Sequence, residues 1–89
     1  MRWKFNKIAI YNLNELDINW ADVINKDARG MSGYDLGEVQ SVNADQVITK
    51  KGLIEGDKFF LPKSLVDLYD GHVLWFRITQ EQAQQYRQS

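Results

Sequence analysis

The sequence predicts a mainly β fold: a small closed or half-closed β-barrel of about six short strands with short flanking helices, whose strand order the pattern leaves open. Three observations support this fold class. The chain has 89 residues, the length of one domain, and 44% of them are hydrophobic, so a packed core is expected. Its apolar runs are short and alternate with polar residues, as strands do. Clusters of glycine, asparagine and aspartate separate these runs, as turns do.

A helical turn is the first element expected in this domain. Asn19 has the character of a helix N-cap, and Asp22 at the third helical position favours one or two helical turns through Ile24. Gly30 and Gly33 then bracket a turn.

Three strands are expected in the middle of the chain. Leu36–Val42 is the first, and two valines three residues apart interrupt its alternation, so a bulge is predicted near Gln40–Ser41. Gln46–Lys50 and Lys58–Leu61 are the next two. Pro62 has no N–H to donate to a sheet, so the last of these strands ends there or lies on an edge.

A β-hairpin is expected around Asp70–Gly71, because this dipeptide favours tight turns and apolar runs flank it. A two-residue loop would place an aspartate opposite Leu74. One added loop residue instead pairs Leu68 with Leu74. It also pairs Val66 with Phe76, so a bulged three-residue loop is predicted.

The second hairpin strand has an inner and an outer set of side chains. The expected inward residues are Leu74, Phe76 and Ile78, and the outward ones are Val73, Trp75 and Arg77. The sequence from Thr79 to Gln82 then fits a capping box, which predicts a short helix running toward Arg87.

The composition excludes several kinds of site. There is no cysteine, and the single histidine, His72, cannot form a two-histidine metal site. No nucleophile–base pair, metal cluster or cofactor loop is recognisable, so we expect no enzymatic activity and no cofactor. The 11 Lys and Arg residues nearly balance the 12 Asp and Glu residues, so no global field attracts nucleic acid or a membrane surface. No apolar run has the length of a membrane span and no signal peptide is visible, so the expected location is the cytoplasm.

Five motifs follow one another in the chain. They are a G-x-V-x-x-V strand at Gly37–Val42, a strand at Val47–Thr49, an aromatic strand that ends in proline at Phe59–Pro62, a hairpin from Val66 to Ile78, and a T-x-E-x-A segment at Thr79–Ala83. In this order they resemble the PRC-barrel family, over roughly Trp20 to Tyr86. The resemblance implies a small β-barrel that serves as a docking platform for proteins, in some members on RNA-processing or ribosomal assemblies. It implies no catalytic motif.

The start of the chain has no counterpart in that pattern. Residues 1–13 carry three basic residues and no acidic residue, whereas residues 14–45 carry seven acidic residues and two basic ones. We expect residues 1–18 to form an N-terminal extension and residues 19–89 to form the PRC-barrel-like domain. Three roles are open to the extension: an added strand, a cap on the barrel, or self-association.

An outward apolar surface is the first candidate functional site. Its expected members are Trp75, Val73, Arg77 and Phe60. Trp75 is central because tryptophan is enriched at interface hot spots. Two explanations of an outward Trp75 remain open: contact with a partner, or coverage by a helix or by the extension. The predicted function is a non-enzymatic adaptor that binds a protein partner, self-association included.

A lysine cluster supports an alternative function, an RNA-processing or ribosome-associated binding module. Its expected members are Lys50, Lys51, Lys58 and Lys63, with Phe60 among them. If the strands that carry them pair, the lysines would gather on one side to neutralise phosphates, and the aromatic ring would stack on a base. Solubilising charges on a sheet edge are the simpler explanation.

Overall fold

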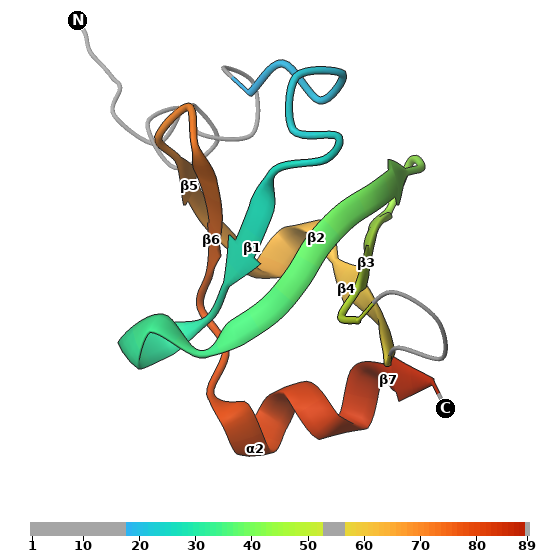
Figure 1. Cartoon of the computed structure of the whole chain (residues 1–89), viewed down its shortest axis with the longest axis vertical. Helices are drawn as coiled ribbons and strands as arrows, with labels where there is room; N and C mark the ends of the chain where they lie inside the picture. The colour runs from blue at the N-terminus through green and yellow to red at the C-terminus, as the bar shows by residue number, and fades with distance from the viewer. Residues whose placement is uncertain (1–17, 53–56, 89) are drawn as a thin grey trace, which may run out of the picture.

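A computed structural model describes residues 18–52 and 57–88 (Figure 1). Seven strands lie within these residues: β1 Asp27–Arg29, β2 Asp35–Val42, β3 Gln46–Lys50, β4 Lys58–Pro62, β5 Val66–Tyr69, β6 Val73–Phe76 and β7 Arg87–Gln88. The short helical segments are η2 Met31–Gly33, η3 Lys63–Leu65, α2 Gln80–Ala83 and η4 Gln84–Tyr86. The proposed N-terminal extension lies outside the described residues, apart from Ile18.

The strands form one curved sheet in the order β5-β6-β1-β2-β3-β4-β7 (Figure 1). Every neighbouring pair is antiparallel except β1 with β6. The mainly β class is therefore confirmed. The closed barrel is not, because the two terminal strands of the described sheet, β5 and β7, do not pair with each other. The expected number of strands was also too low, because β1 and β7 are too short to show alternation.

β1 joins the two parts of the sheet. It pairs with β2 on one side and with β6 on the other, and Ala28 at its centre is fully buried. Gly30 allows the following chain to lie against Ile78, since a Cβ at Gly30 would lie 2.6 Å from the Ile78 carbonyl oxygen. The Met31 amide donates to that same carbonyl at 2.8 Å. The turn expected between Gly30 and Gly33 is η2.

The helical turns expected through Ile24 do not form. Asn19 does accept a hydrogen bond at its side-chain oxygen from the Ala21 amide, at 3.1 Å. The backbone then makes turns, because Asn25 has a φ of 72° and its amide donates to the Val39 carbonyl of β2. The contact with the sheet replaces the bond that would have continued a helix.

The middle strands agree with the sequence. β3 has the predicted bounds, β4 ends at Pro62, and the register between β2 and β3 shifts between Val39 and Ser41, where the bulge was predicted. At its other end, β4 pairs with β7, and the Arg87 guanidinium lies 3.0 Å from the Asp57 carboxylate.

The hairpin register agrees with the sequence in part. Val66 lies opposite Phe76 as predicted, but Leu68 lies opposite Trp75 and not opposite Leu74. The register shifts by one residue between Val66 and Leu68, so the irregularity falls within β5, and the prediction of a bulged three-residue loop at the turn was wrong. The predicted inward residues Leu74, Phe76 and Ile78 are buried. The predicted capping box is confirmed: the Thr79 hydroxyl accepts from the Gln82 amide, and the Gln82 side chain accepts from the Thr79 amide.

The core lies on the inner face of the curved sheet. Its largest fully buried side chains come from several strands, from the loop before β1 and from the segment after β6, and they include Phe59, Leu36, Leu61, Leu74, Ile78 and Val23. Thr49 is the one buried polar residue among the described residues, and its hydroxyl has no hydrogen-bond partner there. Such a hydroxyl loses its bonds to water on folding and gains nothing in exchange.

We predict that Thr49→Val stabilises the fold. Valine has nearly the same shape and removes the unpartnered hydroxyl, so the free energy of unfolding should rise by about 1 kcal/mol. Chemical denaturation of the two proteins would measure this. Thr49→Ser is the matched control, because it keeps the hydroxyl and loses a buried methyl group, and it should lower stability. A stabilising serine or a destabilising valine would show that the hydroxyl is satisfied.

We also predict a large loss of stability for Gly37→Ala. Gly37 has a φ of +91°, and a Cβ there would lie 2.3 Å from the Lys50 carbonyl oxygen of β3. The loss in unfolding free energy should exceed about 2 kcal/mol, because backbone strain and a clash add together. Gly71→Ala separates the two effects, since Gly71 has a φ of +94° with no atom near its Cβ position. Equal losses for the two variants would contradict the clash with β3.

Candidate functional site

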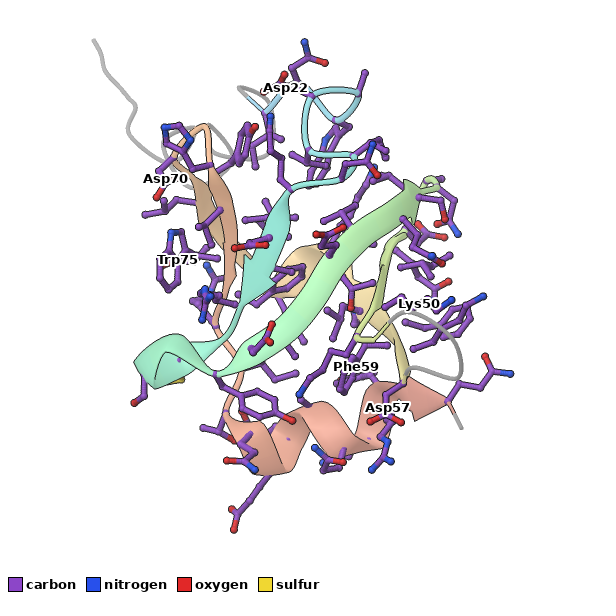
Figure 2. The ribbon with its side chains drawn as sticks, viewed as in Figure 1. Asp22, Lys50, Asp57, Phe59, Asp70 and Trp75 are labelled. Carbon is purple, nitrogen blue, oxygen red and sulfur yellow. The ribbon has the colours of Figure 1, made fainter. Side chains whose placement is uncertain are left out.

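Trp75 lies on the outer face of the sheet. The neighbouring residues of β6, Leu74 and Phe76, are buried, and alternation directs the indole to the other side. Trp75 lies opposite Leu68 of β5 on one side and Arg29 of β1 on the other. Figure 2 shows it at the margin of the molecule, pointing away from the sheet and next to Asp70.

The Asp70 side chain accepts hydrogen bonds from both the hairpin turn and the Trp75 indole. One carboxylate oxygen accepts from the backbone amides of His72 and Val73, each at 2.8 Å. The other accepts from the Trp75 indole Nε1–H at 3.1 Å. A single side chain therefore sets both the turn and the orientation of the half-buried tryptophan.

These bonds lower the pKa of the Asp70 carboxyl from 3.8 to about 2. The indole contributes most, and the two backbone amides follow, because each donates to the charged form of the carboxyl. Asp70 is therefore ionised at neutral pH.

A hollow of about 460 Å³ lies beside Trp75, between η2, β5 and β6. It is lined by Gly30, Met31, Ser32, Asp67, Leu68, Trp75, Phe76 and Arg77. Met31 is 53% exposed and Leu68 is 41% exposed, and they are the two most exposed large hydrophobic residues in the described part of the chain. We call Met31, Leu68 and Trp75, with their rim of Asp67, Asp70 and Arg77, the Trp75 surface.

Arg77 is fixed at the rim. Its guanidinium donates to the carbonyl oxygens of Val66 at 3.1 Å and Ser64 at 3.0 Å, and it lies 3.6 Å from the Asp67 carboxylate. These bonds tie the end of β6 to the terminal strand β5. The rim of the hollow is thus polar and its floor is apolar, which is the composition of many protein-binding surfaces.

The residues predicted for the interface do not all meet. Trp75 and Arg77 line the hollow, whereas Val73 lies nearer the hairpin turn and is half-buried. Phe60 lies on the outer face of β4, and β1, β2 and β3 separate that strand from β6. Met31 and Leu68 were not predicted as members of the site, although a methionine in a turn between two glycines is a usable signal of exposure.

The predicted lysine cluster is divided. Lys50 and Lys58 are cross-strand neighbours, and Phe60 follows on the same face of β4. The other two lysines contact aromatic rings: the Lys51 ammonium lies 5.2 Å from the centre of the Tyr34 ring, and the Lys63 ammonium lies 4.4 Å from that of Trp20. Lys63 follows the opposite end of β4, and the acidic Glu38 lies opposite Lys50.

No family model matches the sequence, and no curated protein matches it. Across residues 18–52 and 57–88, no helix combines the length and the apolar character needed to cross a membrane. The same residues contain no group of three histidine, aspartate or glutamate side chains that could hold a metal ion.

We predict that Asp70→Asn separates the two roles of Asp70. Asparagine keeps an oxygen for the backbone amides of the turn, but its NH₂ group cannot accept from the indole. The NMR signal of the Trp75 indole N–H should shift, while the amide signals of the hairpin stay close to their original positions. Asp70→Ala should disturb both. Similar spectra for the two variants would contradict the division of roles.

The same bond gives a pH prediction for the unmodified chain. The folded pKa of about 2 lies below the ordinary value of 3.8, so the contribution of the carboxylate to stability is present at neutral pH. It should be lost as the pH falls from about 4 to about 2, and the Trp75 indole signal should shift over that interval. In Asp70→Asn this shift should be absent.

Proposed function

We propose that this chain is a non-enzymatic adaptor that docks a segment of a partner protein on the Trp75 surface. One observation carries the proposal: the exposed Met31 and Leu68 and the half-buried Trp75 surround a single hollow, and the indole is held in place by Asp70. An isolated exposed hydrophobic residue is ordinary, but several around a hollow with a polar rim are typical of interaction sites.

Docking would gain free energy mainly from burial of apolar area. A side chain of the partner would enter the hollow and contact the Trp75 ring, the Leu68 side chain and the Met31 thioether chain. Methionine adapts to differently shaped partners, and tryptophan supplies a large contact area. The charged rim would exclude water and set the register of the partner.

Membership of the PRC-barrel family is part of this proposal. It is supported by the order of the five motifs, which fall on β2, β3, β4, the β5–β6 hairpin and α2 in turn. The sheet gives the family membership no support, because its terminal strands β5 and β7 do not pair to close a barrel. The cytoplasm is the location proposed for this function.

Binding to RNA is the second candidate function. The neighbouring Lys50 and Lys58, with Phe60 on the same face, favour it. The separation of Lys63 and the acidic Glu38 opposite Lys50 count against a continuous basic track. A pull-down from native lysate, divided into nuclease-treated and untreated halves, distinguishes the two functions. Partners lost after nuclease treatment and at raised salt would favour RNA.

We predict that Trp75→Ala weakens capture of a nuclease-resistant partner by about 30-fold, which corresponds to about 2 kcal/mol for a tryptophan at an interface hot spot. The amide spectrum of the variant should otherwise retain the folded pattern, because the indole is on the outer face. The affinity of purified partner and variant, measured by calorimetry, would test this.

Phe60→Ala is the matched control for that experiment. It also removes an outward aromatic side chain, but from a strand that β1, β2 and β3 separate from Trp75. It should leave the affinity unchanged. The proposal fails if the two variants weaken binding equally or if Trp75→Ala has no effect.

A further inference from the structure

The outer face around the Trp75 surface carries a small excess of negative charge. β1, β5, β6 and the hairpin turn place three carboxylates there, those of Asp27, Asp67 and Asp70, and two cationic side chains, Arg29 and Arg77. On the neighbouring β2, Asp35 and Glu38 share a hollow with Lys50 and Lys51, so their charges are balanced. Asp70 is held in its charged form by its hydrogen bonds.

Both arginines are already engaged by the fold. Arg29 donates to the Gly33 carbonyl oxygen at 3.0 Å and lies 3.8 Å from the Asp27 carboxylate. Arg77 donates to two carbonyl oxygens near β5. The excess of negative charge on this face therefore favours a basic occupant, and the apolar hollow favours one that also carries large hydrophobic side chains.

The sequence contains a segment with this composition. Residues 1–13 include three basic residues, no acidic residue and a high proportion of large hydrophobic residues. The basic residues are Arg2, Lys4 and Lys7, and the large hydrophobic ones include Trp3, Phe5, Ile8, Ile10 and Tyr11. In an extended segment, Trp3 and Phe5 would share one face while Arg2 and Lys4 shared the other.

The described chain begins close to the terminal strand β5. Ile18 packs against the core, and the Tyr69 hydroxyl at the end of β5 donates to the Asp22 carboxylate at 2.6 Å. That bond raises the pKa of Tyr69 to about 12, so the contact persists through the neutral range. Residues 14–17 would span at most about 14 Å when extended, so a short connection attaches residues 1–13 to the end of the described chain.

We infer that residues 1–13 bind the Trp75 surface of the same molecule. The basic side chains would face the acidic rim, and an aromatic or branched side chain would occupy the hollow beside Leu68. The inference rests on the proposed function in that both assign the Trp75 surface as a binding site. A docking partner would have to displace residues 1–13 from it.

A spin label tests the inference in the full chain. The chain has no cysteine, so Asn6→Cys introduces a single site for a nitroxide. In a ¹⁵N-labelled sample, the amide signals of Met31 and Leu68 and the Trp75 indole signal should broaden, and reduction of the nitroxide should restore them. The amide signals of Ile48 and Phe60, on the outer face of β3 and β4, should broaden less.

Charge reversal supplies the matched variant. Arg2→Glu, Lys4→Glu and Lys7→Glu together, in the same spin-labelled chain, should abolish the broadening, as should raised salt. The amide spectrum of residues 18–88 should otherwise keep its folded pattern. Absence of broadening in the original chain, or broadening that survives charge reversal, would overturn the inference.

A mixed sample distinguishes the same molecule from a second copy. Spin-labelled chains without ¹⁵N are combined with ¹⁵N-labelled chains that carry no spin label. The mixture is compared with the first sample, in which every chain carries both the nitroxide and ¹⁵N. Equal broadening in the two samples would assign the segment to a second copy and overturn binding within one molecule. The proposed function is tested separately: loss of partner capture in Trp75→Ala, with no broadening from residue 6, would retain the adaptor and reject this occupant.

Discussion

The pairing of β1 with β6 is the constraint on which the rest of the structure depends. β1 has three residues, yet it is the strand through which the β5–β6 hairpin joins β2, β3 and β4 in the sheet. Ala28 at its centre is small and fully buried, and Gly30 allows the next turn to touch the Ile78 carbonyl. This contact also fixes Met31 at the margin of the hollow, so the position of the candidate site depends on the same pairing.

Local rules predicted much of the fold. The bulge in β2, the turn at Asp70–Gly71 and the capping box at Thr79 each depend on a few neighbouring residues, and each is found. The failures involve contacts between distant segments. The amide of Asn25 donates to the Val39 carbonyl of β2 instead of continuing a helix. The three residues of β1 form a strand because they pair with β2 and β6. Neither contact leaves a periodic pattern in the sequence.

The candidate site was predicted in part for a related reason. Alternation shows which side chains point outward, and it identified Trp75 and Arg77 correctly. It does not show which strands are neighbours, so Phe60 was grouped with Trp75 although three strands separate them. Alternation also does not show which ends of the strands are close together. Lys58 begins β4, whereas Lys63 follows its other end and contacts Trp20, so the two lysines do not form one cluster. Met31 lies in the turn that was predicted between Gly30 and Gly33, but its place beside Trp75 depends on the pairing of β1 with β6, which leaves no local pattern in the sequence.

The bond between Asp70 and Trp75 has a consequence for the thermodynamics of the proposed docking. An exposed aromatic side chain normally samples several rotamers, and fixing it on association costs about 0.5–1.5 kcal/mol of conformational entropy. Here the carboxylate that closes the turn also restrains the indole, so part of that cost is met during folding. A rigid ring discriminates among partners by shape and loses little affinity in doing so, whereas the flexible Met31 beside it can adjust. The surface thus combines a preorganised anchor with an adaptable neighbour.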